Sequence, residues 1–483
     1  MSAVKLLLKL TTIIITLLML PWKAVGAAEK PNILFIMADD LGWNDVQWRD
    51  PAMHSPVLDA LAHNHAVRLN HAYVNKLCSI TRSAFLAGHY PFHMGTQADT
   101  FFWMEPSGVP LNFRFFPEYL QKAGYSTYLV GKWHLGYCKK EYLPTSRGFD
   151  HFRGYYCGME DYYKHSFTYK NRTGLDFWVG NKPAFAYNGL YSTEVYTRHA
   201  EDFLVSHNKS RPFFMYLAYQ AVHNPLQVPK KYLAPCTETR KDRRLNLFLG
   251  MVNAMDQSIG HVVDTLRRLE LYRNTVIIFS TDNGGDTRFG GNNYPLRGNK
   301  DTLWEGGTRA VSFVHSPKYI QKAGDRNQLF TVVDWFPTIL AIAGIERQRY
   351  GDGINQWSMI TNGEGTINRT SFVYNIYPTG SAIRRGKYKL IVGDPGNPSG
   401  WIPPSGLIAT KKADKAKGLF LFNIEKDPME RHNLVSMKRI KLISSMLKDV
   451  AKYMLESKAS VHRPTDLRGN PQLFNGTYAT GWC

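Results

Sequence analysis

The chain has 483 residues, of which 44% are hydrophobic and 20% are charged, and it carries a formal net charge of +20 with only five cysteines. Its length exceeds what one hydrophobic core usually serves, so two domains of unequal size are expected, and the low cysteine count excludes a small disulfide-stapled scaffold. The excess of basic over acidic residues predicts an anionic partner; the alternative is that the positive charge only keeps the protein soluble.

The first element is a processing signal rather than part of the fold. Lys5 and Lys9 precede the apolar run 10–20, and small residues follow at 26–28. This pattern predicts a signal peptide at 1–28, since the apolar run is short for a membrane span; an uncleaved anchor is the alternative. No later segment is long and apolar enough to cross a bilayer, so the mature protein is expected to be secreted or lysosomal, without a membrane span.

Asparagine acceptor patterns fit this secretory route. N-glycosylation is predicted at Asn171, Asn208, Asn368 and Asn475. A secreted glycoprotein meets sulfated polysaccharide more often than DNA, and no nucleic-acid-binding motif is visible. A sulfated saccharide, and no nucleic acid, is therefore the expected anionic partner.

Short apolar runs alternate with helical patterns over most of the chain. The runs 32–38, 213–218 and 275–280 are bounded by turn formers, which is typical of strands buried on both faces, and 128–130 is a further strand. Helical patterns lie between them at 116–123 and 251–271. This alternation predicts an α/β fold whose large sheet is mixed, mostly parallel and sandwiched by helices.

The pattern changes after about residue 365. Short strands at 382–384, 388–392 and 419–422 are joined by Gly- and Pro-rich turns, and one closing helix is expected at 437–457. These elements predict a smaller C-terminal α+β domain with an antiparallel sheet. The predicted division is a signal peptide at 1–28, an α/β domain at 29–365 and the C-terminal domain at 366–483.

Two of the buried strands run into acidic and amide side chains. Asp39 and Asp40 follow the strand at 32–38, and Asp282 and Asn283 follow the strand at 275–280. Ligand sites in open α/β sheets lie beyond the carboxyl ends of strands, and three carboxylates with one amide are hard oxygen donors suited to Ca²⁺ or Mg²⁺. Each segment alone is equally typical of a solvated turn, but their agreement in type and position predicts a metal site.

Basic and imidazole side chains follow other strand ends. Lys132 and His134 come after the strand at 128–130 and, two residues apart on an extended segment, are expected to project to the same side. A cation beside an imidazole can hold an anionic group and move a proton. His223 follows the strand at 213–218, and Lys300 lies in a glycine-flanked loop. Each of these residues alone is equally typical of a structural or surface position.

One further segment, 78–82, has the sequence Cys-Ser-Ile-Thr-Arg. It resembles the signature Cys-x-Pro-x-Arg of the type I sulfatases, in which the cysteine is oxidised to formylglycine (3-oxoalanine). The acidic, basic and imidazole residues above follow the order and approximate spacing of that family, and the stretches 290–298 and 303–307 are similar to its branch with arylsulfatases B, I and J. The likeness covers nearly the whole mature chain. Ile80, where the family pattern has proline, is the one clear departure at the site.

This resemblance implies an alkaline-phosphatase-like fold and a sulfuric ester hydrolase acting on aryl sulfates or sulfated sugars, including glycosaminoglycans. It implies one Ca²⁺ held by Asp39, Asp40, Asp282, Asn283 and the modified Cys78. The catalytic residues that it implies are Cys78 and Arg82 for the nucleophile, Lys132, Lys300 and His223 for the sulfate and leaving group, and His134 as the base that releases sulfate. It also implies a formylglycine-generating enzyme as the maturation partner.

Two other functions stay open at this point. A binding protein would keep the fold, the calcium and the anion site without turnover if Ile80 prevents modification of Cys78. A phosphohydrolase on the related alkaline phosphatase fold would need a Ser or Thr nucleophile and usually two zinc ions with more histidine ligands, which the sequence does not show.

The remaining cysteines leave the disulfide pattern open. Cys138, Cys157, Cys236 and Cys483 allow three pairings. The sequence does not choose among them.

Overall fold

The computed structural model describes residues 30–233, 242–363, 369–402 and 416–483, and the chain from Pro31 to Cys483 forms one compact unit. The predicted signal peptide, Asn368 and Cys236 lie outside these residues. Within the described ranges, none of the helices combines the length and the apolar character that a membrane span requires. The boundary predicted between residues 365 and 366 stays a prediction.

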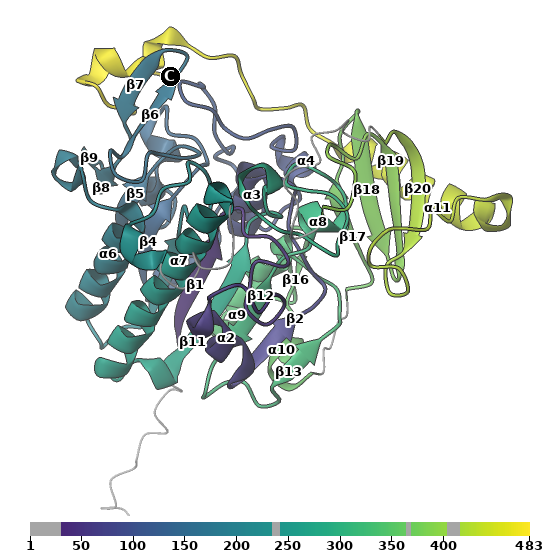
Figure 1. Ribbon diagram of the computed structural model, residues 1–483, viewed down its shortest axis with the longest axis horizontal. Helices are drawn as coiled ribbons and strands as arrows, with labels where there is room; N and C mark the ends of the chain where they lie inside the picture. The colour runs from purple at the N-terminus through teal and green to yellow at the C-terminus, as the bar shows by residue number, and fades with distance from the viewer. Residues whose placement is uncertain (1–29, 234–241, 364–368, 403–415) are drawn as a thin grey trace, which may run out of the picture. The chain divides into compact units, whose positions relative to one another are not determined.

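A mixed sheet of ten strands forms the centre of the fold (Figure 1). Its spatial order is β13 (Gly324–Arg326), β2 (Ala66–Leu69), β12 (Ser312–His315), β11 (Thr275–Thr281), β1 (Asn32–Ala38), β10 (Phe213–Ala218), β4 (Ser126–Lys132), β5 (His151–Tyr155), β8 (Trp178–Val179) and β9 (Lys182–Pro183). The central strands from β11 to β5 pair in parallel, while β12 and β8 pair antiparallel with the strands beside them. The large, mostly parallel sheet predicted from the sequence is confirmed.

The central strands are buried on both faces because helices cover both. Ile33 and Phe35 of β1 pack into one hydrophobic cluster, and Leu34 and Ile36 pack into another. The first cluster receives side chains from α3 (Cys78–Ala87), α5 (Phe116–Lys122) and α9 (Trp335–Ile342); the second receives them from α2 (Pro56–His63), α6 (Ser192–Ser206) and α7 (Arg243–Arg268). In Figure 1, α6 and α7 run side by side over the sheet. Burial on both faces explains why these strands are continuous apolar runs without polar alternation.

Shorter elements complete the α/β part. The helices are α4 (Pro91–Met94), α8 (Glu305–Thr308) and α10 (Trp357–Asn362), and the two-stranded pairs are β3 (Ala72–Tyr73) with β14 (Phe330–Thr331), β6 (Ser166–Tyr169) with β7 (Arg172–Leu175), and β15 (Arg349–Tyr350) with β16 (Gly353–Ile354). The helix expected at 251–271 begins eight residues earlier and ends at Arg268, since Asp242 caps its start by accepting a hydrogen bond from the Arg244 N–H.

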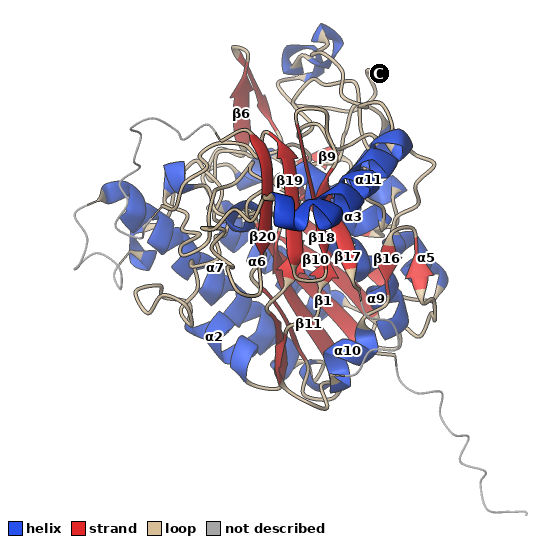
Figure 2. Ribbon diagram, turned by 90° about the vertical axis from the view of Figure 1, so that its right-hand side faces the viewer, coloured by secondary structure: helices blue, strands red, loops and turns tan. Residues whose placement is uncertain are grey.

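The C-terminal region contains a four-stranded antiparallel sheet, as predicted. Its strands, in order, are β17 (Ser371–Asn375), β18 (Gly380–Arg385), β19 (Tyr388–Gly393) and β20 (Gly418–Asn423). The closing helix α11 (Ile440–Glu456) lies across this sheet in Figure 2. Ile443, Met446 and Val450, spaced at helical intervals, are its buried face.

A buried ionic cluster ties the small sheet to the α/β part of the fold. The Lys389 ammonium group of β19 lies 3.0 Å from the Glu305 carboxylate of α8 and 2.9 Å from the Glu430 carboxylate, and these side chains are fully buried. Tyr73 and Tyr374 donate hydrogen bonds to Glu305. Burial raises the pKa of Glu430 to about 7 although Lys389 opposes it. Burial also opposes ionisation of Glu305, but the charges of Lys389, Arg309 and Arg384 together outweigh it and lower the pKa of Glu305 to about 2.

A second bridge joins α11 to the α/β part. His93 Nδ1 lies 2.8 Å from the Asp352 carboxylate, and its Nε2 lies 3.4 Å from the Glu456 carboxylate at the end of α11. Burial lowers the pKa of His93, but these two carboxylates outweigh it and hold the pKa above its ordinary value.

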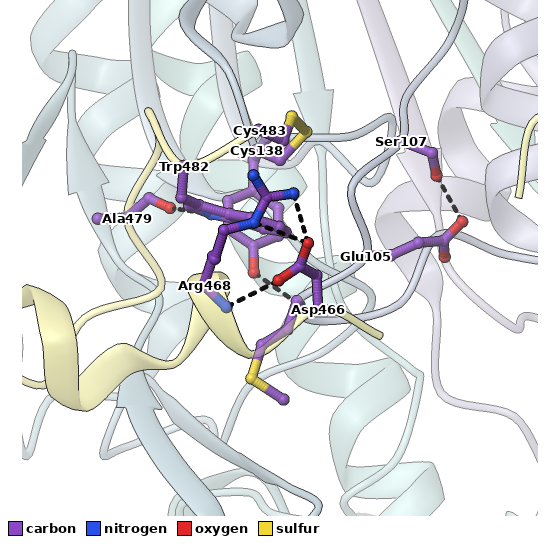
Figure 3. The surroundings of a disulfide bond; sticks show 10 residues. Glu105, Ser107, Cys138, Asp466, Arg468, Ala479, Trp482 and Cys483 are labelled. Atoms are coloured by element: carbon purple, nitrogen blue, oxygen red, sulfur yellow. Dashed lines mark hydrogen bonds and ion pairs between the residues drawn. A yellow bond between two sulfur atoms is a disulfide. The ribbon is translucent and has the colours of Figure 1, made fainter. Parts of the chain in front are cut away.

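The C-terminal tail returns to the opposite side of the molecule, beside the β6–β7 hairpin (Figure 1). Leu175 and Tyr478 bond backbone to backbone there, and a disulfide joins Cys138 to Cys483 (Figure 3). Cys157 is a buried free thiol. Of the cysteine pairs that the sequence left open, the structure forms Cys138–Cys483 and leaves Cys157 unpaired.

Candidate functional site

The candidate site lies at the edge of the sheet where the central parallel strands end. Asp39 and Asp40 follow β1, Asp282 and Asn283 follow β11, Lys132 ends β4 and His223 follows β10. Cys78 is the first residue of α3, and Lys300 reaches the same edge from the loop before α8. Because parallel strands end on one side, four segments distant in the sequence deliver their side chains to one place.

Three buried carboxylates face three buried cations. Arg82 donates to Asp282 from Nε (3.0 Å) and Nη2 (2.9 Å), and its Nη2 lies 3.6 Å from Asp39. Lys132 forms an ion pair with Asp39. Lys300 Nζ lies 2.7 Å from Asp40. The charges balance in this state, so binding a divalent cation would leave the site net positive and ready for an anion.

The carboxylates crowd one another. Burial and then the charge of Asp39 raise the pKa of Asp282 to about 6. Burial also opposes ionisation of Asp40, but Lys300 and His223 outweigh it and hold the pKa of Asp40 below its ordinary value. A cation placed between these groups would relieve their repulsion.

Cys78 lies inside this charged set. Its Sγ is 3.4 Å from Asp39 Oδ1, and the side chain is 2% exposed. Burial raises the pKa of the Cys78 thiol, and the Asp39 charge raises it further. Since the reactive form of cysteine is the thiolate, the unmodified residue is a poor nucleophile here.

Ile80 occupies the third position of α3. The first intrahelical bond runs from the Thr81 N–H to the Leu77 carbonyl, so the Ile80 N–H belongs to the free first turn of the helix. Proline, which lacks an N–H, would therefore cost no helix hydrogen bond at this position. Hydrogen bonding within the folded helix therefore does not explain why this chain has isoleucine where the family pattern has proline.

The two histidines differ in which ring nitrogen is available. His134 Nε2 lies 3.0 Å from the Phe101 carbonyl, an acceptor, so it carries the proton, and the buried Nδ1 has no hydrogen-bond partner. His223 Nδ1 lies 2.7 Å from the Asn224 carbonyl, and its Nε2 faces Asp40 Oδ2 at 3.6 Å. Burial and then Lys132 lower the pKa of His134 well below its ordinary value, and burial and then Lys300 lower the pKa of His223 to about 3. Both rings are neutral at physiological pH.

The backbone at His134 differs from the sequence expectation. Lys132 ends β4, and His134 has φ 61° instead of continuing an extended segment. Gly131, at φ 100°, lies so close to the next strand that an added Cβ would be 2.0 Å from the Ala218 carbonyl oxygen. The turn, rather than strand alternation, sets the direction of His134. Asp40 also has a positive φ, of 60°, and such conformations concentrate at functional sites.

The donor set fits a hard divalent cation. Asp39, Asp40, Cys78 and His223 each offer a ligand atom within 4.8 Å of the others. Asn283 adds an amide whose buried Oδ1 has no hydrogen-bond partner, while its Nδ2 donates to Asp40 at 2.7 Å. Carboxylate and amide oxygens dominate this set, as Ca²⁺ requires.

The structure brings together every site residue expected from the sequence, and it adds supporting residues that the sequence did not reveal. Tyr216 accepts a hydrogen bond from Arg82, and Tyr162 donates one to the His223 carbonyl. Ser79 donates to the His134 carbonyl, which links the segment after Cys78 to the turn after β4. Tyr216 lies within a predicted strand, yet nothing in that apolar run marked its hydroxyl as part of the site.

Comparisons with known proteins agree with this geometry. Residues 31–345 match the family model described as Sulfatase. The chain is 35% identical to arylsulfatase J of Mus musculus over 494 residues, which cover 95% of this chain and 81% of the relative. It is 31% identical to N-acetylgalactosamine-6-sulfatase of Homo sapiens over 371 residues, covering 73% of this chain and 69% of that protein.

A solved structure shares the fold. Ps i-CgsB in complex with k-i-k-neocarrahexaose is 27% identical, covers 93% of this chain and 100% of its own, and has a TM-score of 0.77. The fold with a central sheet and an additional C-terminal sheet is therefore one that a solved structure already shows.

Proposed function

The chain belongs to the sulfatase family and is a sulfuric ester hydrolase, and from this premise we propose that it cleaves sulfate esters with a formylglycine made from Cys78 and one bound Ca²⁺. The observation that carries the proposal is a buried cysteine at the start of a helix, 3.4 Å from Asp39 and surrounded by balanced carboxylates and cations. Asp39, Asp40, Asp282, Asn283 and the modified Cys78 are the proposed ligands. The bound ion would supply a positive charge that lowers the pKa of a hydroxyl beside it.

The modification explains why a cysteine stands at this position. A hydrated aldehyde has two hydroxyls, so one can attack sulfur and the other can expel sulfate afterwards, which a serine cannot do. Arg82 is buried against Asp282 and Asp39, and it would fix the nucleophile's orientation by holding these carboxylates in place.

Lys132 and Lys300 would bind the sulfate oxygens. Both ammonium groups lie at the strand ends beside Cys78, and preorganised charges of this kind favour the anionic transition state. Lys300, or His223 once its Nε2 has taken up a proton, would give a proton to the leaving oxygen. His134 would act as the base that releases sulfate, because its buried Nδ1 has an unused lone pair.

Sulfated sugars are the substrate class that we propose. One relative is named for a sulfated N-acetylgalactosamine, and a solved structure with 27% identity is described in complex with k-i-k-neocarrahexaose. The net charge of +20 supports an anionic, saccharide-sized partner. We also propose a secreted or lysosomal location, which is supported by the exposure of the acceptor residues Asn171, Asn208 and Asn475.

The test compares protein made with and without a formylglycine-generating enzyme. The mass of the peptide that contains Cys78 reports aldehyde or thiol, and hydrolysis of an aryl sulfate reports turnover. Activity should rise in proportion to the aldehyde fraction and should be lost in Cys78→Ala. Cys157→Ala is the matched control, because Cys157 is also a buried free thiol but lies outside the site. Turnover by protein whose Cys78 is entirely thiol would contradict the proposed nucleophile, and a fully modified but inactive protein would favour a binding function.

A further inference from the structure

A second basic pocket lies on the flank of the large sheet, near its β2–β13 edge. It has a volume of about 460 Å³, and its walls include three arginines and two tryptophans: Arg49, Arg68, Arg309, Trp43 and Trp48. We call it the arginine pocket. Its volume falls within the range of about 300–1,000 Å³ that is usual for small-molecule sites.

The three arginines lie close together, and fewer carboxylates than arginines lie beside them. Arg68 pairs with the half-exposed Asp325 at 2.7 Å, and Arg309 lies 3.8 Å from Glu305. Arg49 makes no ion pair with any carboxylate of the described residues; its Nη1 donates to the Trp43 carbonyl at 2.8 Å. Burial and then the charges of Arg309 and Arg68 lower the pKa of Arg49 well below its ordinary value. The charge of Asp325 opposes this shift. Since arginine stays protonated, three arginines beside one another create a positive potential that an anion would relieve.

Aromatic rings give the pocket a second kind of surface. The Arg49 guanidinium lies 3.2 Å from the centroid of the Trp43 ring, and the Arg309 guanidinium lies 4.5 Å from it. Trp48 is half-buried and packs against His63 and Phe313. Guanidinium groups bind sulfate and carboxylate oxygens through paired N–H donors, and indole rings provide flat apolar surface beside them. This pairing suits an acidic sugar better than a free inorganic anion.

The pocket adjoins the candidate site along the chain. Trp43 comes three residues after Asp40, so the two Cα atoms can be at most about 11 Å apart. Arg309 ends the segment that begins with Lys300, and its Nε donates to the Asn70 carbonyl at 2.8 Å. A saccharide chain that spans both places would present one unit to Cys78 and another unit to the arginine pocket.

We propose that the arginine pocket is a subsite for an acidic sugar unit of the substrate, whose sulfate or carboxylate group binds Arg49 and Arg68. This proposal deepens the proposed function and rests on its substrate class. It assigns saccharide selectivity to residues outside the reacting centre, while an aryl sulfate, which has no second unit, does not use the pocket.

The kinetic test uses Arg49→Gln and Arg68→Gln. On a chondroitin sulfate tetrasaccharide, each variant should lower kcat/KM about tenfold to a hundredfold, mainly through KM, because a charge-assisted hydrogen bond to a bound anion is lost. On 4-nitrocatechol sulfate, kcat/KM of each variant should stay within about twofold of the value for the parent protein without the substitution. Arg468→Gln is the matched control, since Arg468 is exposed and paired with Asp466 as Arg68 is paired with Asp325. Equal losses on both substrates would overturn the proposal.

A binding measurement separates this proposal from the proposed mechanism. In a Cys78→Ala background, calorimetric titration with the same tetrasaccharide reports affinity without turnover. Arg49→Gln should weaken that affinity by a similar factor, even if the protein hydrolyses no substrate tested. An unsulfated chondroitin tetrasaccharide shows which group the pocket recognises. If Arg49→Gln weakens binding of both tetrasaccharides, the carboxylate is assigned; if it weakens binding of the sulfated one alone, the sulfate is assigned. Unchanged affinity of Arg49→Gln for both tetrasaccharides would refute the subsite.

Discussion

Replacing Lys389 with methionine tests the buried cluster that joins the small sheet to the α/β part of the fold. The ammonium group lies 3.0 Å from Glu305 and 2.9 Å from Glu430, with no exposed surface on any of the three side chains. Methionine fills a similar volume but leaves two buried carboxylates without their shared cation. Breaking a buried pair in this way costs about 3–5 kcal/mol of unfolding free energy.

The expected change in melting temperature follows from the size of the folded unit. At about 2.1 cal/mol/K per residue, roughly 450 residues give an unfolding entropy near 0.95 kcal/mol/K, so Lys389→Met should lower Tm by about 3–5 °C in differential scanning fluorimetry. Lys417→Met is the control, since Lys417 pairs with Asp394 at 3.2 Å but is 68% exposed, and such a pair contributes at most about 1 kcal/mol.

The pH dependence of this loss identifies its cause. Burial raises the folded-state pKa of Glu430 above its unfolded value, so a protonated Glu430 favours folding, and this contribution is lost as pH rises through about 7. The penalty of Lys389→Met should therefore shrink at pH 5.5, and adding Glu430→Gln should recover part of it at pH 7.5. A Tm within about 1 °C of the parent, or a penalty independent of pH, would refute the ionic explanation.

Three further results are expected. Ile80→Pro should raise the aldehyde fraction at Cys78 and the sulfatase activity in proportion, because proline presents the unfolded segment to the modifying enzyme in a preformed shape; peptide mass spectrometry checks this, and complete modification without activity would contradict it. Asp282→Ala should reduce bound calcium measured by atomic emission and remove the loss of Tm on chelation; an unchanged calcium content would reject this ligand. His93→Gln should lower Tm more at pH 5.5 than at pH 8.5, since the raised pKa of His93 makes its contribution greatest below its unfolded pKa and loses it as pH rises through the folded value; an equal shift at both pH values would count against the charged bridge.

The sequence predicted the parts of the site that follow strand ends. The strand at 32–38 is apolar from Ile33 to Ala38 because both of its faces are buried, so its end at Asp39 is sharp. In β11 the apolar run 276–279 ends three residues before Asp282, and the rule that ligands gather at carboxyl ends of parallel strands then brings both residues together. These inferences need only local pattern and topology.

Other features depend on tertiary contacts that no local pattern encodes. His134 takes its direction from a left-handed turn packed against the neighbouring strand, so the expected extended geometry was wrong, although His134 still lies at the candidate site. The Cys138–Cys483 disulfide joins positions 345 residues apart. These two cysteines can pair only because the C-terminal tail folds back to the side of the molecule where Cys138 lies. Arg49 and Arg68 lie on different elements, and only folding places both beside Trp43.

One short segment connects three of these features. Between residues 300 and 309, Lys300 contacts Asp40 of the candidate site, Glu305 binds Lys389 of the small sheet, and Arg309 lines the arginine pocket. The position of this segment is held through Glu305, whose backbone N–H donates to Glu430 at 2.7 Å and whose carboxylate accepts from two tyrosines. Among the described residues, the C-terminal sheet places no side chain at the candidate site, yet it holds the segment whose Lys300 is proposed to bind sulfate and whose Arg309 lines the proposed saccharide subsite. Weakening that anchor should therefore disturb sulfate binding and saccharide binding together, whereas substitutions within the pocket should affect the saccharide alone.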